Sequence, residues 1–223
     1  MLRDLFRNAP QNFLRVFRGR NLVWHVLAIA ITAVLVLSDA DWQYFEITRS
    51  DSLWFSVIVF AAGIGGFILP VLVPLALYFW GQFRTDRALM LTAAATGQAA
   101  AIGYLVSVVY KIFTGRTQPE FLTHFGTTDI SRAFHFGLFQ NGIFWGWPSS
   151  HAAVAFAAAT CFALLSRSRA AGIVALGCAV FIGFGASIGF HWLSDVLAGA
   201  ILGILAGTIV AKRFADGISA STT

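Results

Sequence analysis

Charged residues are scarce in this sequence. Asp, Glu, Lys and Arg make up 11% of its 223 residues, whereas hydrophobic residues make up 58%. A water-soluble domain carries about 25% charged residues, so this chain has too few polar groups to cover a surface in water. The mean hydropathy of +0.76 agrees with this. The composition excludes an ordinary soluble globular protein and indicates an integral membrane protein.

Cysteine and clustered positive charge are also lacking. The two cysteines, Cys161 and Cys178, both lie in apolar runs, where cysteine behaves as a small buried hydrophobic residue. No disulfide framework is implied. The net charge is +5, but the basic residues stand at the ends of apolar segments rather than together on one face. This pattern is typical of a membrane protein and argues against nucleic acid as a partner.

Long apolar runs predict the fold. A membrane-spanning helix needs about 20 mostly apolar residues, and six stretches meet or approach that length: 22–38, 54–80, 88–113, 151–166, 170–190 and 192–211. We therefore expect an all-α polytopic membrane protein, a six-transmembrane-helix bundle. Its parts are a basic amphipathic N-terminal segment (1–21), the six-helix domain (22–213) with an outer loop at about 114–147, and a short C-terminal tail (214–223).

Basic residues predict the orientation of the bundle, because Lys and Arg favour the cytoplasmic side of short loops. With six spans, eleven of the fifteen basic residues fall on one side: Arg3, Arg7, Arg15, Arg18, Arg20, Arg84, Arg87, Arg167, Arg169, Lys212 and Arg213. The other side holds four, which are Arg49, Lys111, Arg116 and Arg132. Both termini are therefore expected in the cytoplasm.

The N-terminal segment has more than one interpretation. Its basic leader, apolar run and small residues at 38–40 loosely resemble a cleavable signal peptide. Removing that run would leave five spans and break the charge alternation, so a retained helix is preferred. Upstream of the run, residues 2–20 interleave arginines with Leu and Phe. They form either an interfacial amphipathic segment or a basic tail that only sets the topology.

The predicted topology gathers ionisable residues at one membrane face. Three segments distant in sequence place them at the outer ends of the third, fourth and sixth spans: Lys111 and Arg116; Ser149, Ser150 and His151; His191 and Asp195. An aspartate inside a span costs about 2.5–3.5 kcal/mol on insertion scales, so it is presumed functional. The gathering of these groups indicates a site.

Each of these residues also has an ordinary structural interpretation. His191 and Asp195 are four residues apart, and such a pair can be a simple interfacial hydrogen bond. Ser149 or Ser150 can be a helix N-cap. Lys111 can extend its amine to the interface and Arg116 can bind lipid headgroups. Their convergence on one face favours function over these separate explanations.

The residue types match one kind of chemistry. An aspartate that holds a histidine fixes its tautomer and makes it a better nucleophile or base. A second histidine can protonate a leaving oxygen, while Lys, Arg and helix N-terminal N–H groups stabilise phosphoryl oxygens. Together these groups indicate phosphoryl transfer through a phosphohistidine.

The order and spacing of these residues resemble the type-2 phosphatidic acid phosphatase family, the membrane lipid phosphatases related to vanadium haloperoxidases. The family motifs K-x6-R-P, P-S-G-H and S-R-x5-H-x3-D correspond here to "KIFTGRTQP" (111–119), "PSSH" (148–151) and "FGASIGFHWLSD" (184–195). The resemblance implies His191 as nucleophile, Asp195 as its orienter and His151 as general acid. It further implies Ser149 and Lys111 as phosphate-binding residues, with no cofactor and no metal.

Both arginines of the family motifs are absent. Gln118 and Gly185 occupy their positions, Phe184 replaces the adjoining serine, and Ser150 stands for the glycine of the second motif. Three explanations are open. Arg116 and Arg132 replace the arginines, with Ser150 and Gln118 assisting; the substrate carries less negative charge than a diphosphate; or catalysis has been lost.

Two further patterns have alternative interpretations. The outer loop is rich in aromatic residues and forms either a lid for a lipid headgroup or an interfacial belt; these are Phe121, Phe125, Phe134, Phe136, Phe139, Phe144, Trp145 and Trp147. Gly199, Gly203 and Gly207 make a close-packing face, either within the bundle or between protomers of a homo-oligomer. His124 and His135 are taken as ordinary polar residues.

The leading hypothesis is a metal-independent lipid phosphate phosphatase or phosphotransferase of a bacterial inner membrane, with its site facing the periplasm. The partners expected are a lipid phosphate substrate and membrane lipids. The alternatives are an intramembrane serine acyl hydrolase that uses Ser149 or Ser150, a non-catalytic lipid-binding or transport protein, and a zinc site at His151, His191 and Asp195.

Overall fold

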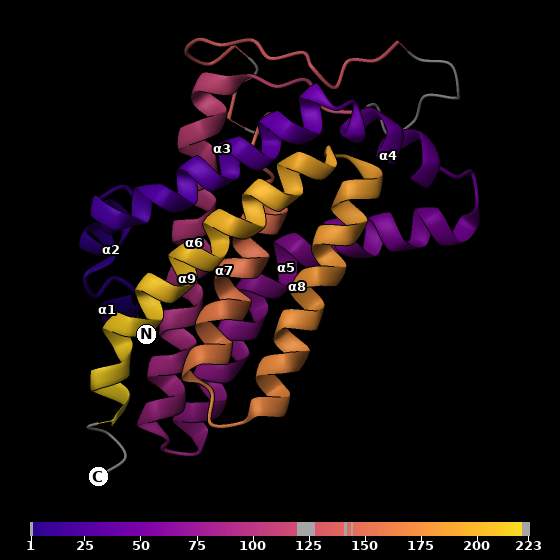
Figure 1. The fold of residues 1–223 in the computed structure, drawn as a ribbon. Coiled ribbons are helices and arrows are strands. Elements are labelled where there is room, and N and C mark those ends of the chain that lie inside the picture. The colour runs from indigo at the N-terminus through magenta and orange to yellow at the C-terminus, as the bar shows by residue number, and fades with distance from the viewer. Residues whose placement is uncertain (1, 120–127, 141, 144, 220–223) are drawn as a thin grey trace.

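The computed structural model describes residues 2–119, 128–140, 142, 143 and 145–219, and within these ranges it is all-helical. The elements follow the chain from indigo to yellow in Figure 1. They are α1 (Leu2–Leu5), α2 (Ala9–Val16), the short 3₁₀ helix η1 (Gly19–Asn21), α3 (Leu22–Leu37), α4 (Ala40–Thr48), α5 (Leu53–Phe83), α6 (Arg87–Thr114), α7 (Ser150–Leu165), α8 (Arg169–Gly189) and α9 (Leu193–Ser219). The predicted helical fold class is confirmed.

Five helical segments among the described residues are long and apolar enough to cross a membrane. They are Gly19–Leu37, α5, α6, α8 and α9. The apolar helix α7 is shorter, at 16 residues. These six segments coincide with the six predicted apolar stretches, so the chain is a membrane protein. The side of the membrane on which each terminus lies stays a prediction.

The polar residue before each of four helices determines where that helix begins. Ser52 accepts a hydrogen bond from the Phe55 N–H at 3.2 Å, and Asp86 accepts one from Leu89 at 3.0 Å. Ser149 and Ser168 cap α7 and α8 in the same way, through Ala152 and Ala171. Each cap satisfies a backbone N–H that has no partner within the helix. The expectation that "PSS" holds an N-cap is confirmed for Ser149.

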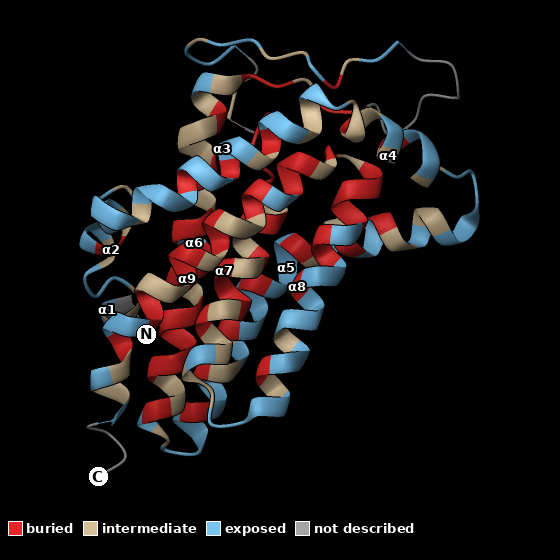
Figure 2. Cartoon of the chain, in the orientation of Figure 1, coloured by how far each residue is buried: buried red, intermediate tan, exposed pale blue. Residues whose placement is uncertain are grey.

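The core lies where α6, α7 and α9 meet, as the buried residues in Figure 2 show. Three glycines of α9 face α7, and a Cβ atom at any of them would collide with a backbone carbonyl: Ser149 for Gly199, Ala153 for Gly203 and Ala157 for Gly207. Small residues let two helices in a membrane approach closely. The glycine face is thus occupied within one chain, and a homo-oligomer would need another surface.

Helix α5 packs beside α6 and α8 over much of its length, while its first part projects sideways past α8 (Figure 1). Pro70 and Pro74 lie inside this 31-residue helix. Proline is a residue at which helices bend, because it lacks an N–H and its ring crowds the preceding turn. The face of α5 that is turned away from the bundle carries exposed large side chains, among them Leu72, Phe79 and Trp80. Such a face is suited to lipid.

The N-terminal segment is docked on the bundle. Asp4 forms an ion pair with Arg87 at 2.8 Å, and the fully buried Asn12 donates a hydrogen bond to Gln98 in α6 at 2.7 Å. Helix α3 then runs obliquely across the molecule beside α9 (Figure 1). His25, near the start of α3, lies 2.6 Å from the Tyr110 hydroxyl. The described residues 2–21 therefore pack against the bundle.

Candidate active site

The turn between α8 and α9 carries His191, and the first turn of α9 carries Asp195. The His191 Nδ1–H donates to Asp195 Oδ2 at 3.4 Å, and the side chains are 5% and 0% exposed. Burial lowers the pKa of His191, and the hydrogen bond that its ring donates to Asp195 opposes that effect. In the neutral ring this hydrogen bond holds the proton on Nδ1 and leaves a lone pair on Nε2.

Asp195 is held by several donors besides His191. Its Oδ1 accepts from Arg116 Nη1 at 2.5 Å. Its Oδ2 accepts from Gln118 Nε2 at 3.2 Å and from the Trp192 N–H at 3.3 Å. A buried carboxylate needs such partners, because taking its charge out of water is unfavourable. The orientation of Asp195 is thus set from three different points of the chain.

His151 lies in the first turn of α7, facing the same space as His191. The centroids of the two imidazole rings are 6.1 Å apart. His151 packs edge-on against Phe67 of α5 and against Phe190, with centroid separations of 4.5 and 4.8 Å. These aromatic contacts fix the ring in an apolar setting beside the other histidine. The structure therefore brings together two residues that stand 40 positions apart in the sequence.

A cavity of about 720 Å³ connects these groups. Its polar lining consists of Lys111, Ser150, His151 and His191. Its remaining walls are largely apolar or aromatic and come from α5, α6, the outer loop and the α8–α9 turn: Val59, Phe60, Gly63, Ile64, Phe67, Tyr104, Ile143, Trp145 and Phe190. A few converging polar groups in an apolar cleft are typical of a small-molecule site. Trp145, one of the aromatic residues of the outer loop, lines this cavity.

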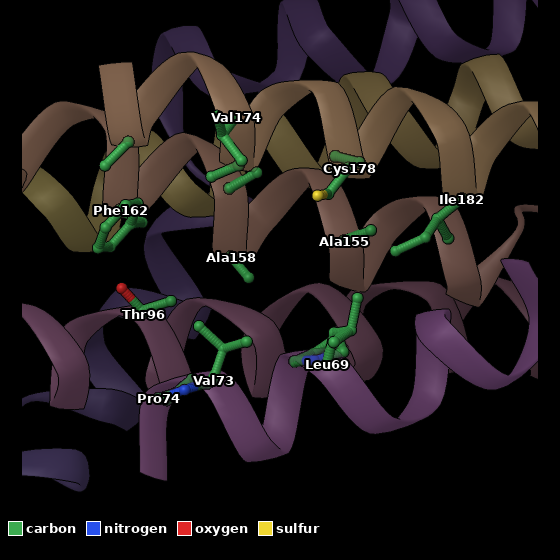
Figure 3. Close-up of a pocket in the computed structure, with 15 residues that line it drawn as sticks. Leu69, Val73, Pro74, Thr96, Ala155, Ala158, Phe162, Val174, Cys178 and Ile182 are labelled. Carbon is green, nitrogen blue, oxygen red and sulfur yellow. The ribbon is translucent and has the colours of Figure 1, made fainter. Parts of the chain in front are cut away.

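A second cavity, of about 370 Å³, opens between α5, α7 and α8 (Figure 3). Leu69, Val73, Phe162 and Val174 line it together with alanines, and Thr96 and Cys178 contribute its side-chain heteroatoms. Within the described part of the chain, no histidine or charged residue borders this cavity. It has room for hydrocarbon but lacks groups for catalysis, so the 720 Å³ cavity is the candidate active site.

Two arginines expected to bind phosphate lie elsewhere. The fully buried Arg116 donates to Asp41, Ser194 and Asp195, and to the backbone carbonyl of Ser131. Its guanidinium thus holds protein groups behind His191 and does not line the cavity. Arg132 forms a solvent-exposed ion pair with Asp39, and it does not line the cavity either.

The close approach of α5 explains why position 185 carries glycine. A Cβ atom on Gly185 would collide with the Ala62 Cβ and lie 3.0 Å from the Ile58 carbonyl oxygen. An arginine at this position therefore has no space. The other arginine position is taken by Gln118, whose amide donates to Asp195 and to the Gly146 carbonyl at 3.1 Å. Gln118 thus also supports Asp195 rather than a ligand.

The two serines of "PSSH" are engaged separately. Ser149 caps α7 and is fully buried, whereas the Ser150 hydroxyl lies 2.9 Å from that of Ser107. Among the described residues, no hydrogen bond joins either serine hydroxyl to His191. A serine hydrolase needs that contact, so this alternative has no geometric support.

The zinc alternative also lacks support. The described part of the chain contains no group of three or more His, Cys, Asp or Glu side chains placed to hold a metal ion. Asp195 is directed to Arg116 and His191 instead.

Four of the predicted aromatic or polar loop residues, Phe121, His124, Phe125 and Phe144, lie outside the described residues, so the lid hypothesis stays a prediction.

One residue that supports this site is not apparent from the sequence. Asp41, in α4, is fully buried and accepts hydrogen bonds from Arg116 at 2.7 Å and from the Ser194 N–H at 2.8 Å. In the sequence it stands among four acidic residues of a short loop, where it counts only as an outer-side charge. No local pattern distinguishes it from Asp39, because its partners are 75 and 153 residues away.

Comparison with known protein families gives one match, to the model of the PAP2 superfamily over residues 88–217. The chain belongs to the PAP2 superfamily. The match covers α6 to α9 and so includes Lys111, His151, His191 and Asp195. No curated protein and no solved structure matches the chain. Membership in this superfamily supports a phosphatase-type function for a membrane protein, and it leaves α1 to α5, with Asp41, outside the matched region.

Proposed function

We propose that this chain is a lipid phosphate phosphatase or phosphotransferase that acts at the outer, periplasmic face of a bacterial inner membrane. The single observation that carries the proposal is the convergence of Lys111, His151 and His191 on one cavity, with Asp195 behind His191. The apolar walls of that cavity suit a lipid, and its polar end suits a phosphate. The charge alternation along the chain supports the periplasmic orientation.

The proposed reaction proceeds in two displacements at phosphorus. His191 Nε2 attacks the phosphorus atom, the bond from phosphorus to the leaving oxygen breaks, and His151 donates a proton to that oxygen. Asp195 holds the Nδ1–H and stabilises the positive charge that develops on the ring. Water or a lipid hydroxyl then attacks the phosphohistidine while His151 takes its proton, and the P–N bond breaks to restore His191.

The charge of the cavity favours a weakly charged substrate. Of the four basic residues on the outer side, only Lys111 lines the cavity. Arg116 is shared by two carboxylates and Arg132 is paired with Asp39. A diphosphate carries more negative charge than one lysine and neutral donors can offset. We therefore favour a phosphate monoester or diester of a lipid over a lipid diphosphate.

Phosphate release from a panel of lipid phosphates, with EDTA present, tests the proposal. The detergent-purified protein is expected to act on monoesters faster than on diphosphates, and His191→Ala and His151→Ala are expected to abolish release. His135→Ala is the matched control, because His135 is exposed and outside the cavity. For diesters, release of the leaving alcohol is measured. If wild type and His191→Ala release equal amounts of product, the mechanism is contradicted. If neither protein turns over any lipid phosphate, with water or with a lipid acceptor, a non-catalytic lipid-binding protein is favoured.

A further inference from the structure

Three charged side chains are buried together behind the nucleophile. Arg116 lies between Asp41 and Asp195, with N–O distances of 2.7 and 2.5 Å, and all three side chains are 0% exposed. They come from α4, the loop after α6, and α9. Helix α4 lies at the end of the bundle where α9 begins (Figure 1). Burial of three charges is unfavourable unless geometry and hydrogen bonds compensate it, so this arrangement calls for an explanation.

Asp41 fixes the start of α9 as well as Arg116. Its Oδ1 accepts from the Ser194 N–H at 2.8 Å, and its Oδ2 accepts from the Ser194 hydroxyl at 2.5 Å. Ser194 directly precedes Asp195 in the chain. One carboxylate therefore holds both the backbone beside Asp195 and the guanidinium that grips Asp195 Oδ1. Movement of Asp41 would displace Asp195 Oδ2, the atom that meets His191.

The charge count has a second consequence. One guanidinium between two carboxylates leaves one negative charge in excess. Without Asp41, the positive charge of Arg116 would act on Asp195 alone and would weaken its attraction for a proton or a positive charge on His191. With Asp41 present, Arg116 is already compensated, and the charge of Asp195 remains available to the imidazole.

We propose that Asp41 is a positioning residue for the phosphoryl-transfer reaction, acting through Arg116 and Ser194 to orient Asp195 and thereby His191. This inference rests on the proposed function. It goes beyond the PAP2 match, because Asp41 lies outside the matched residues 88–217. Asp41 thus connects the N-terminal part of the chain to His151, His191 and Asp195, which all lie in the C-terminal half.

The groups facing His191 determine how its titration reports on Asp41. Asp195 of α9 favours the protonated ring, while Lys111 of α6 and Arg116 disfavour it. His151 of α7 lies beside it, and α5 presents Val59 and Gly63 to the same cavity. Removing the Asp41 charge leaves Arg116 less compensated. Protonation of His191 then becomes harder, so the acid limb of the rate profile moves to lower pH.

The test compares Asp41→Asn with Asp39→Asn, the same change two residues earlier in a solvent-exposed pair. Asp41→Asn is expected to lower kcat by as much as about 100-fold through misplacement of the nucleophile, with KM within about twofold of wild type. Its kcat/KM acid limb is expected at lower pH. Asp39→Asn is expected to match wild type in all three quantities. A folded Asp41→Asn with wild-type kcat and acid limb would overturn the proposal.

A variant that keeps all charges covers the case in which Asp41→Asn fails to fold. Ser194→Ala removes the hydroxyl contacts to Asp41 and Arg116 only. It is expected to lower kcat with KM and the acid limb unchanged, and an unchanged kcat would contradict the positioning role. Thermal unfolding of each variant verifies that it is folded.

A measurement without turnover separates this inference from the proposed function. The titration of His191 is followed by NMR of the ¹⁵N-histidine-labelled protein, which has five histidines, and assigned with His191→Ala. If wild type turns over no lipid phosphate, with water or with a lipid acceptor, the proposed function fails, yet a lower titration midpoint in Asp41→Asn still supports the link from Asp41 to His191. Identical midpoints in wild type and Asp41→Asn would overturn the inference whatever the activity.

Discussion

At the residue scale, a single lysine or arginine among the described residues borders the cavity. The resemblance to the phosphatase motifs implied a lysine and two arginines around the phosphate, and this chain retains the lysine. Lys111 is 1% exposed and lines the cavity with both histidines. Arg116, two residues from the motif position, is instead turned to Asp41 and Asp195. The proposed phosphate site is therefore expected to depend on Lys111 more strongly than a site with three cations would.

Replacement of Lys111 tests that dependence. A hydrogen bond to a charged group is worth about 1.5–3 kcal/mol, so Lys111→Gln is expected to lower kcat/KM for a lipid monoester by about 10- to 150-fold. Arg169→Gln, an exposed basic residue at the other end of the bundle, is the matched control and should behave as wild type. Steady-state kinetics of both variants provide the measurement. A Lys111→Gln enzyme with unchanged kcat/KM would show that the phosphate binds elsewhere.

At the element scale, the site is shaped by how closely helices approach one another. Gly199, Gly203 and Gly207 bring α9 against α7, which places the start of α9 beside the N-terminus of α7 and Asp195 beside Ser149. This contact includes the Ser149 N–H donating to the Asp195 carbonyl at 3.0 Å. Helix α5 approaches α8 equally closely at Gly185 and Gly189. The close packing of α5 against α8, which forms part of the cavity wall, leaves no space for an arginine at position 185.

Two alanine substitutions measure the approach of α5 to α8. Gly185→Ala would place a Cβ against Ala62 and is expected to destabilise the protein by about 1–3 kcal/mol, as overpacking does. Gly177→Ala, on the same helix, meets nothing within 4 Å and is expected to be neutral or stabilising by up to about 1 kcal/mol. Denaturation in detergent compares the two. Equal stabilities would mean that α5 does not contact α8 at position 185.

At the scale of the whole molecule, the ionisable groups divide between the two ends of the bundle. Arg167 pairs with Asp86 at 3.3 Å at the end opposite the cavity. Arg132 pairs with Asp39 at the cavity end. The charge alternation along the sequence assigns the excess of basic residues to the end that holds Arg167, and that end is therefore expected in the cytoplasm.

Labelling in whole cells tests this orientation. In a Cys178→Ala background, a cysteine at Asp39 is expected to react with a membrane-impermeant maleimide from the periplasm. A cysteine at Thr85 is expected to react only after lysis. Thr85 is exposed and the Asp39 side chain is 50% exposed, while the remaining native Cys161 is buried. If only Thr85→Cys were labelled in intact cells, the topology would be the reverse of the one expected, and the site would face the cytoplasm.

The sequence by itself determined the membrane class, the helical fold and the positions of the six apolar segments, because hydropathy and cap residues act locally. It also predicted Lys111, His151, His191 and Asp195 as site residues, since each lies at the end of such a segment. The tertiary structure decided where Arg116, Arg132 and Gln118 point, and it added Asp41. Those outcomes depend on which charges meet over separations of 75 residues or more, and such pairing leaves no periodic or local pattern in the sequence.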